Sequence, residues 1–223
     1  MVDDDTIIKN YLKVLEFAEL YSGCTKAHLA AGLFSKDDRY EPILGANGVV
    51  SGSCRKKEIC TRKRDEDLQA EFRSCPSACG EATVIFNMHH IPPEELDDSY
   101  MICARPPCER CAAAMLLYGE KEIITELYFG EYRNGEPRDK DNFNVDIVIA
   151  SGIKVHQIKF IDGRYEIVDV KRAHDLNDPY YKERGLRLPN PVPYGHINGN
   201  NLPLSRKLSF DKRKKFFGRT YSL

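Results

Sequence analysis

The sequence predicts an α/β fold in which helices connect neighbouring parallel strands of one central sheet. From residue 79 to residue 160, the patterns follow one another as helix, strand, helix, strand, helix, strand. This order is typical of chains that wind back and forth across a parallel sheet. The chain is also large enough for a sizeable core, because it has 223 residues, of which 42% are apolar and 30% charged.

One helix and two strands are predicted ahead of this alternation. Residues 6–21 have a helical period, with apolar side chains gathered on one face: Ile7, Tyr11, Val14, Leu15 and Ala18. Residues 28–35 and 42–50 predict two strands joined by the polar turn 36–41. Residues 51–67 are strongly charged and predict a loop.

The alternating elements each have a distinct pattern. They are a helix at 79–88, a buried apolar strand at 99–104, an alanine-rich helix at 108–119, a strand at 123–129, a helix at 142–152 and a strand at 153–160. Gly119 and Gly152 close two of these helices, since glycine is common where helices end.

The composition changes after about residue 170, where prolines, glycines and asparagines become frequent. Residues 205–223 carry seven Lys or Arg against one Asp. We therefore expect a catalytic domain at residues 1–170, followed by an extended Pro-rich and basic C-terminal arm at residues 171–223. We expect the arm to be an intersubunit or lid element, with a disordered tail as the alternative. Its basic and aromatic side chains could also bind single-stranded nucleic acid.

No membrane segment is predicted, because no apolar run reaches the roughly 18 residues that span a bilayer. The acidic N-terminus also lacks the pattern of a signal peptide, so we expect a cytoplasmic protein. Thiols stay reduced in that compartment. The eight cysteines are then metal ligands or buried side chains rather than disulfides.

Three of the cysteines have the spacing of a metal site. Cys108 and Cys111 form a Cys-x-x-Cys after a proline pair, at the start of a predicted helix where both share one face. A lone Cys-x-x-Cys is equally typical of a zinc-ribbon knuckle or of core thiols. Cys79 supplies a third thiolate, and three protein ligands with an open position are typical of catalytic zinc. Glu81, two residues further on, can reach a water molecule on the metal without ligating it.

The set Cys79-x-Glu81 and Pro107-Cys108-x-x-Cys111 resembles the signature of the zinc-dependent cytidine deaminase superfamily. The resemblance implies a three-layer α/β/α fold with a central mixed five-stranded sheet. It also implies hydrolytic deamination, with Zn²⁺ activating water and Glu81 moving the protons.

Three further segments resemble the deoxycytidylate (dCMP) deaminase branch of that superfamily, including its phage members. They are "GANGVVSGSC" at 45–54, "IITELYFGEYRNGEP" at 123–137 and "ASGIKVHQI" at 150–158. This implies that the substrate is a small-molecule nucleotide, with dCMP converted to dUMP and ammonia, and that the protein is a homo-oligomer. By the same resemblance, Asn47 contacts the sugar, and Tyr132 and Tyr128 pack against the base or sugar.

The sequence departs from the pattern of that branch at several positions. Cys79 stands where the branch usually has histidine, Val50 where it has proline, and Gly80 where it has alanine, which we expect to widen the floor of the pocket. A phosphate site needs cationic side chains, and the candidates follow the Asn47 loop: Arg55, Lys56, Arg62 and Lys63.

Four more cysteines are candidates for a second, structural zinc, with scattered free thiols as the alternative: Cys24, Cys54, Cys60 and Cys75. Two other functions stay open at this point. One is a nucleic-acid-editing deaminase that acts on transfer RNA or single-stranded DNA. The other is a zinc-stabilised binding module, although a purely structural site has no use for the carboxylate of Glu81.

Overall fold

The structure of the protein is a computed structural model that describes residues 2–24, 27–48, 78–119, 122–132 and 139–171, together with Gly135, Pro179 and Glu183. The chain divides into two units, Met1–Arg187 and Leu188–Leu223, and all of the described residues belong to the first. The predicted boundary at residue 170 follows the last described strand, which ends at Asp169.

The helices are α1 (Asp4–Tyr21), α2 (Gly80–Asn87), the short α3 (Pro93–Leu96), α4 (Glu109–Gly119) and α5 (Asp139–Ala150), with a 3-10 turn η3 (Met88–His90) between α2 and α3. The strands are β1 (Ala30–Ser35), β2 (Ile43–Ala46), β3 (Ser99–Cys103), β4 (Ile124–Phe129), β5 (Lys154–Ile161) and β6 (Arg164–Asp169). The helices and strands predicted among the described residues are confirmed, and η3, α3 and β6 are additional. The predicted loop at 51–67 and the last two residues of the strand predicted at 42–50 lie outside the described residues.

The strands form one mixed sheet in the order β2-β1-β3-β4-β5-β6. β3, β4 and β5 are parallel neighbours, as the alternation predicts. β1 is antiparallel to both β2 and β3, and β6 is antiparallel to β5. The sheet therefore has six described strands, and the prediction of five was wrong.

The additional strand follows a tight hairpin. Asp162 and Gly163 both have positive φ, 50° and 84°, in the two-residue turn between β5 and β6. An Asp-Gly pair is favoured in such turns because both central residues must adopt positive φ. The sequence therefore contained a signal for β6 in this dipeptide.

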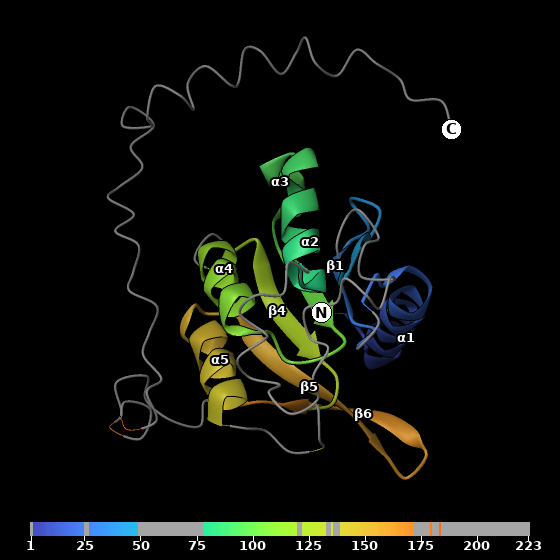
Figure 1. The fold of residues 1–223 in the computed structure, drawn as a ribbon. Coiled ribbons are helices and arrows are strands. Elements are labelled where there is room, and N and C mark those ends of the chain that lie inside the picture. Colours follow the sequence, from blue (N-terminus) through green and yellow to red (C-terminus); the bar gives the residue numbers. More distant parts are fainter. Residues whose placement is uncertain are drawn as a thin grey trace, which may run out of the picture. The chain divides into compact units, whose positions relative to one another are not determined.

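The sheet is covered by helices on both faces, so the predicted three-layer α/β/α arrangement is confirmed (Figure 1). Side chains alternate along β3: Tyr100 and Ile102 pack in the cluster that contains α1. Met101 and Cys103 pack in the cluster that contains α2, α4 and α5. This alternation is the period of two that a strand buried on both faces requires.

α1 forms where the sequence predicts an amphipathic helix. Asp3 caps its start, and the Asp3 carboxylate accepts a hydrogen bond from the Thr6 amide at 2.9 Å. Ile7 and Val14 are buried against the sheet, as the helical period predicts. Among the described residues, no helix combines the length and the apolar character needed to cross a membrane.

Candidate active site

Cys79 stands at the start of α2, on the end of the helix where amide hydrogens are unpaired. Its backbone is extended, with φ −75° and ψ 155°, and its carbonyl accepts the first helical hydrogen bond, from Thr83 at 3.1 Å. The preceding residue, Ala78, exchanges two backbone hydrogen bonds with Gly48. Cys79 is therefore fixed from both sides, by the helix and by the loop after β2.

Cys108 stands in the same way at the start of α4, five residues after the end of β3. Its carbonyl accepts a hydrogen bond from the Ala112 amide at 2.8 Å. The carbonyl of Pro107 accepts a hydrogen bond from the Nδ2 of Asn144, at 3.3 Å. Asn144 is a residue of α5 that is only 2% exposed, and its Oδ1 has no partner among the described residues.

The two helix starts bring three sulfurs together. The Sγ of Cys108 lies 3.5 Å from the Sγ of Cys79 and 3.4 Å from the Sγ of Cys111, and all three lie within 4.8 Å of one another. Tetrahedral zinc with Zn–S bonds of about 2.3 Å places neighbouring sulfurs about 3.8 Å apart. The donor set and its spacing therefore fit a zinc ion with three protein ligands.

The charges of these thiols depend on one another. The pKa of Cys108 lies well below its ordinary value, because its sulfur forms hydrogen bonds with the sulfurs of Cys111 and Cys79 and with the amides of Cys111 and Arg110. The pKa of Cys79 and that of Cys111 are both raised, mainly because of the sulfur–sulfur hydrogen bond that each shares with Cys108. Three thiolates side by side require a cation, and this is what a bound metal provides.

Glu81 lies in the first turn of α2, beside the sulfurs. Burial raises the pKa of Glu81 to about 7, and the nearby charge on Cys108 adds to this effect, while hydrogen bonds from its own amide and from Cys111 oppose it. A divalent cation among the sulfurs would act in the opposite direction and favour the carboxylate. The carboxyl group is thus held next to the three candidate metal ligands without being one of them.

Gly80, between the first thiol and Glu81, does not face a pocket. A side chain there would run into the backbone of Gly45 and Ala31. The expectation that Gly80 widens the floor of the pocket was therefore wrong, because the space is filled by main chain.

Asn47 is buried, and both polar atoms of its side chain form hydrogen bonds within the protein. Its Oδ1 accepts hydrogen bonds from Ser22 at 2.6 Å and from the Leu29 amide at 3.0 Å, and its Nδ2 donates to the Ala27 carbonyl at 2.9 Å. In this geometry Asn47 joins the loop before β1 to the loop after β2.

The two candidate tyrosines lie in different places. Tyr132, 8% exposed, follows β4 and packs edge-to-face on Phe129, on the side of the sheet that carries the thiols. Tyr128 lies on the side of α1, where its hydroxyl donates to Glu126 at 2.6 Å and its ring stacks on His156.

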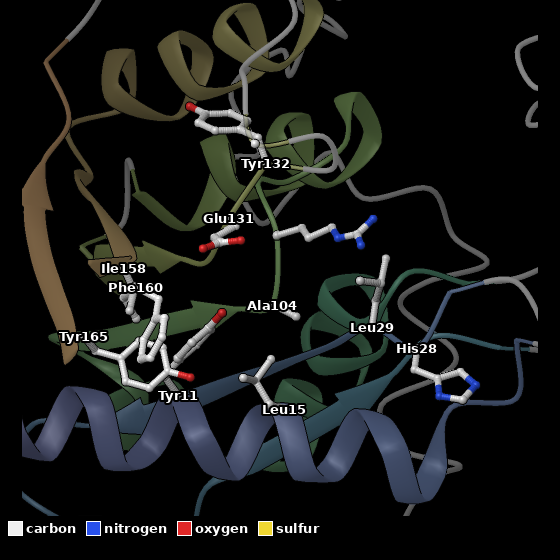
Figure 2. A pocket seen from close by; sticks show the side chains of 12 residues that line it. Tyr11, Leu15, His28, Leu29, Ala104, Glu131, Tyr132, Ile158, Phe160 and Tyr165 are labelled. Carbon is white, nitrogen blue, oxygen red and sulfur yellow. The ribbon is translucent and has the colours of Figure 1, made fainter. Parts of the chain in front are cut away.

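A pocket of about 430 Å³ opens at the carboxyl ends of β3 and β4, between α1 and the loops that follow these strands (Figure 2). It combines aromatic rings with charged groups and is lined by Tyr11, Leu15, His28, Leu29, Ala104, Arg105, Glu131, Tyr132, Gly135, Ile158, Phe160 and Tyr165. Its wall at Ala104 and Arg105 is the segment that leads to Cys108. The pocket and the thiols therefore share the end of β3, where ligands bind in many α/β sheets.

The remaining candidates are only partly described. Cys24 is a buried free cysteine, and Cys103 is buried in the core as its place in an apolar strand predicts. The other candidates for a second metal or for phosphate lie outside the described residues: Cys54, Arg55, Lys56, Cys60, Arg62, Lys63 and Cys75. Asn144 was not among the sequence candidates, because nothing in a helical pattern indicates which residue reaches another loop.

No protein-family model matches the chain, and no curated protein matches its sequence. Two solved structures of dCMP deaminase from the cyanophage S-TIM5 are similar to it. The complex with dCMP and dUMP is 16% identical, with 70% of this chain and 99% of that chain covered and a TM-score of 0.49. The apo form is 17% identical over the same shares, with a TM-score of 0.45.

Proposed function

We propose that the protein is a zinc-dependent hydrolase that deaminates a cytosine nucleotide, with dCMP as substrate and dUMP and ammonia as products. The observation that carries the proposal is the convergence of Cys79, Cys108 and Cys111 at two helix starts, with Glu81 beside them. Three thiolates satisfy three zinc positions and leave one for a small ligand. A structural site would be closed by a fourth protein ligand.

Each residue then has a separate task. Cys79, Cys108 and Cys111 would hold the zinc ion, which when bound supplies a Lewis acid that lets water act as a nucleophile near neutral pH. Glu81 takes a proton from the attacking water and passes protons to the ring nitrogen and to the amine that leaves. One water is consumed, the bond between ring carbon and amine breaks, and the products are the uracil nucleotide and ammonia.

The pocket supports a charged nucleotide rather than a bare base. Arg105 lines it together with the candidate Tyr132, and a cationic side chain suits a phosphate group. Glu131 lines the same pocket and would disfavour phosphate close to itself. We therefore place the phosphate toward Arg105, with Tyr132 against the base or sugar.

The test is an ammonia assay on the purified full chain with zinc. The panel contains cytidine, dCMP, dCTP, adenosine, AMP and a single-stranded oligonucleotide with cytosines, and the Glu81→Gln variant is the control. We expect release from dCMP above all other compounds. Release from the oligonucleotide alone would favour the nucleic-acid-editing alternative, and no release from any compound that exceeds the Glu81→Gln background would contradict the proposal.

We propose further that the protein is a homo-oligomer. Large apolar side chains are exposed on the two helices α1 and α2, including Leu20 at 62% and Phe86 at 70%. Light scattering on the full chain tests this, and a monomer mass at micromolar concentration would contradict it. The same measurement after truncation at Lys171 shows whether the C-terminal arm contributes.

A further inference from the structure

Helix α2 and strand β2 touch through two glycines that are far apart in the sequence. Gly80 is the first residue of α2, and it lies between the metal-ligand candidate Cys79 and Glu81. Gly45 lies in β2, where it pairs with Ala31 of β1. Both glycines are buried.

The approach is too close for a side chain on either residue. A Cβ on Gly45 would lie 2.6 Å from the carbonyl oxygen of Gly80 and 2.9 Å from the amide nitrogen of Val84. A Cβ on Gly80 would lie 2.7 Å from the carbonyl oxygen of Gly45 and 2.8 Å from the amide nitrogen of Ala31. These neighbours are main-chain atoms, which cannot rotate away as the end of a side chain can.

We infer that Gly45 is a positioning residue for the candidate active site: its missing side chain sets how closely the start of α2 approaches the sheet, and thereby where Cys79 and Glu81 lie relative to Cys108. The inference rests on the proposed function, because it assigns Gly45 to the metal site of that function.

A side chain at Gly45 would displace α2 by more than the geometry of a metal site tolerates. Relaxing a contact from 2.6 Å to the 3.4 Å of ordinary van der Waals contact requires a shift of about 0.8 Å. Metal–ligand distances hold within about 0.2 Å, and a catalytic constellation has to stay within about 0.5 Å of its working geometry. The start of α2 carries Cys79, whereas Cys108 and Cys111 stand on α4, so a movement of α2 alone changes the distances among the sulfurs.

Gly32 provides a matched control in the neighbouring strand β1. A Cβ on Gly32 would lie 2.6 Å from the ring of Phe34 and 2.8 Å from the Cδ2 of Leu44. The distances are as short as at Gly45, but the neighbours are side chains of the cluster around α1, on the face away from the thiols. A methyl group at Gly32 therefore disturbs the fold without pressing on α2.

The experiment compares Gly45→Ala with Gly32→Ala in the full chain. Three quantities are measured: the absorption of the cobalt-substituted protein, the rate of zinc transfer to a chromophoric chelator, and the thermal unfolding temperature. We expect Gly45→Ala to change the cobalt spectrum, to lose zinc ~10-fold faster and to deaminate ~10²-fold more slowly. Gly32→Ala should keep the wild-type cobalt spectrum and zinc rate even where its unfolding temperature falls.

A folded Gly45→Ala protein with wild-type metal properties would overturn the inference. An equal loss of metal binding in Gly32→Ala at a similar unfolding temperature would overturn it too. If Gly45→Ala does not fold, Gly80→Ala tests the same contact from the helix side, and failure of both to fold would assign the contact to the fold and not to the site. If the wild type binds metal but deaminates nothing, the proposed function fails, while the comparison of metal properties still decides the inference.

Discussion

The two faces of the sheet are built from different side chains, although they share the same strands. On the face of α1, aromatic rings are a large part of the core, and tyrosine hydroxyl groups form hydrogen bonds with buried polar side chains. Tyr100 stacks on Phe34 with ring centroids 5.4 Å apart, and its hydroxyl accepts a hydrogen bond from Asn10 at 2.8 Å. Tyr128 donates to Glu126 at 2.6 Å.

On the face of α2, α4 and α5, aliphatic residues and thiols form the core. A cluster of thiols lies on this face at the starts of α2 and α4. Three thiols crowd within 4.8 Å of one another, and the Oδ1 of Asn144 has no partner among the described residues. The faces therefore differ in where their polar groups lie. Tyrosine hydroxyls of the α1 face bond to buried side chains of the same face, although the Nε2 of His156 there has no partner among the described residues. On the opposite face, three thiols gather at two helix starts.

The largest effect is expected for Cys108→Ala, which removes one of the three clustered thiols. Two remaining sulfurs hold zinc only weakly, so both deamination and the metal should be lost. Metal analysis checks this. If Cys24 and the other candidate cysteines hold a second zinc, the content should fall by one atom per chain and not to zero, and an unchanged content would show that Cys108 is not a ligand.

Glu81→Gln should keep the fold and the zinc but lower the deamination rate by about 10²–10⁴-fold, because an amide cannot carry the protons. The measurements are the rate of ammonia release and the zinc content of the same sample. Retention of a tenth of the wild-type rate would show that Glu81 is not the proton carrier.

Asn144→Ala should weaken the entry to α4 without touching a ligand. The Pro107 carbonyl loses its partner, which costs about 1–3 kcal/mol, and zinc transfer to a chelator should become roughly 10-fold faster. Asn142→Ala, on the same helix and half-buried, is the control. Equal zinc rates in the two variants would speak against a role of Asn144 at the site.

Glu126→Gln should weaken hydrogen bonds on the α1 face of the sheet without changing the deamination rate. Glu126 accepts hydrogen bonds from Lys36 at 2.8 Å and from Tyr128. Burial acts to raise the pKa of Glu126, but the bonds from Lys36 and Tyr128 outweigh it, and the pKa ends below its usual value. We expect a loss of about 1–3 kcal/mol in the free energy of unfolding at neutral pH, with unchanged deamination.

The pH dependence of that loss follows from the sign of the shift. A carboxyl group whose pKa is lowered by folding stabilises the protein above its unfolded pKa of about 4.3, and this stability is lost as the pH falls through the folded pKa. The wild type and Glu126→Gln should therefore converge in acid. Denaturant unfolding between neutral pH and acid checks this, with the exposed Glu16→Gln as control, and a difference that grows in acid would contradict the assignment.

The smallest effect is expected for Tyr128→Phe, which tests whether a tyrosine on the α1 face contributes to substrate binding. Loss of the hydroxyl should cost about 1 kcal/mol of stability and leave the KM for dCMP unchanged. Tyr132→Phe is the matched comparison on the thiol side. A KM that rises for Tyr128→Phe would show that Tyr128 contacts the substrate after all.

Sequence patterns alone predict the described helices and strands and the three clustered thiols, because both depend on short-range spacing. The i, i+3 spacing of Cys108 and Cys111 places two thiols on one side of a helix start whatever lies around it. The alternation after residue 79 fixes parallel neighbours, since a strand–helix–strand unit returns to the same sheet. β6 was also within reach of the sequence, through Asp162-Gly163, although its strand was not predicted.

The contacts that surround the candidate site, in contrast, come from tertiary packing and not from sequence patterns. Gly45 meets Gly80 across 35 residues of sequence, and Asn144 meets Pro107 across 37. Neither contact leaves a periodic trace, because each depends on how two finished elements pack. The same holds for Tyr128 and Tyr132, four residues apart around the end of one strand, since the turn of the chain after β4, and not the pattern of β4, sends them to opposite faces.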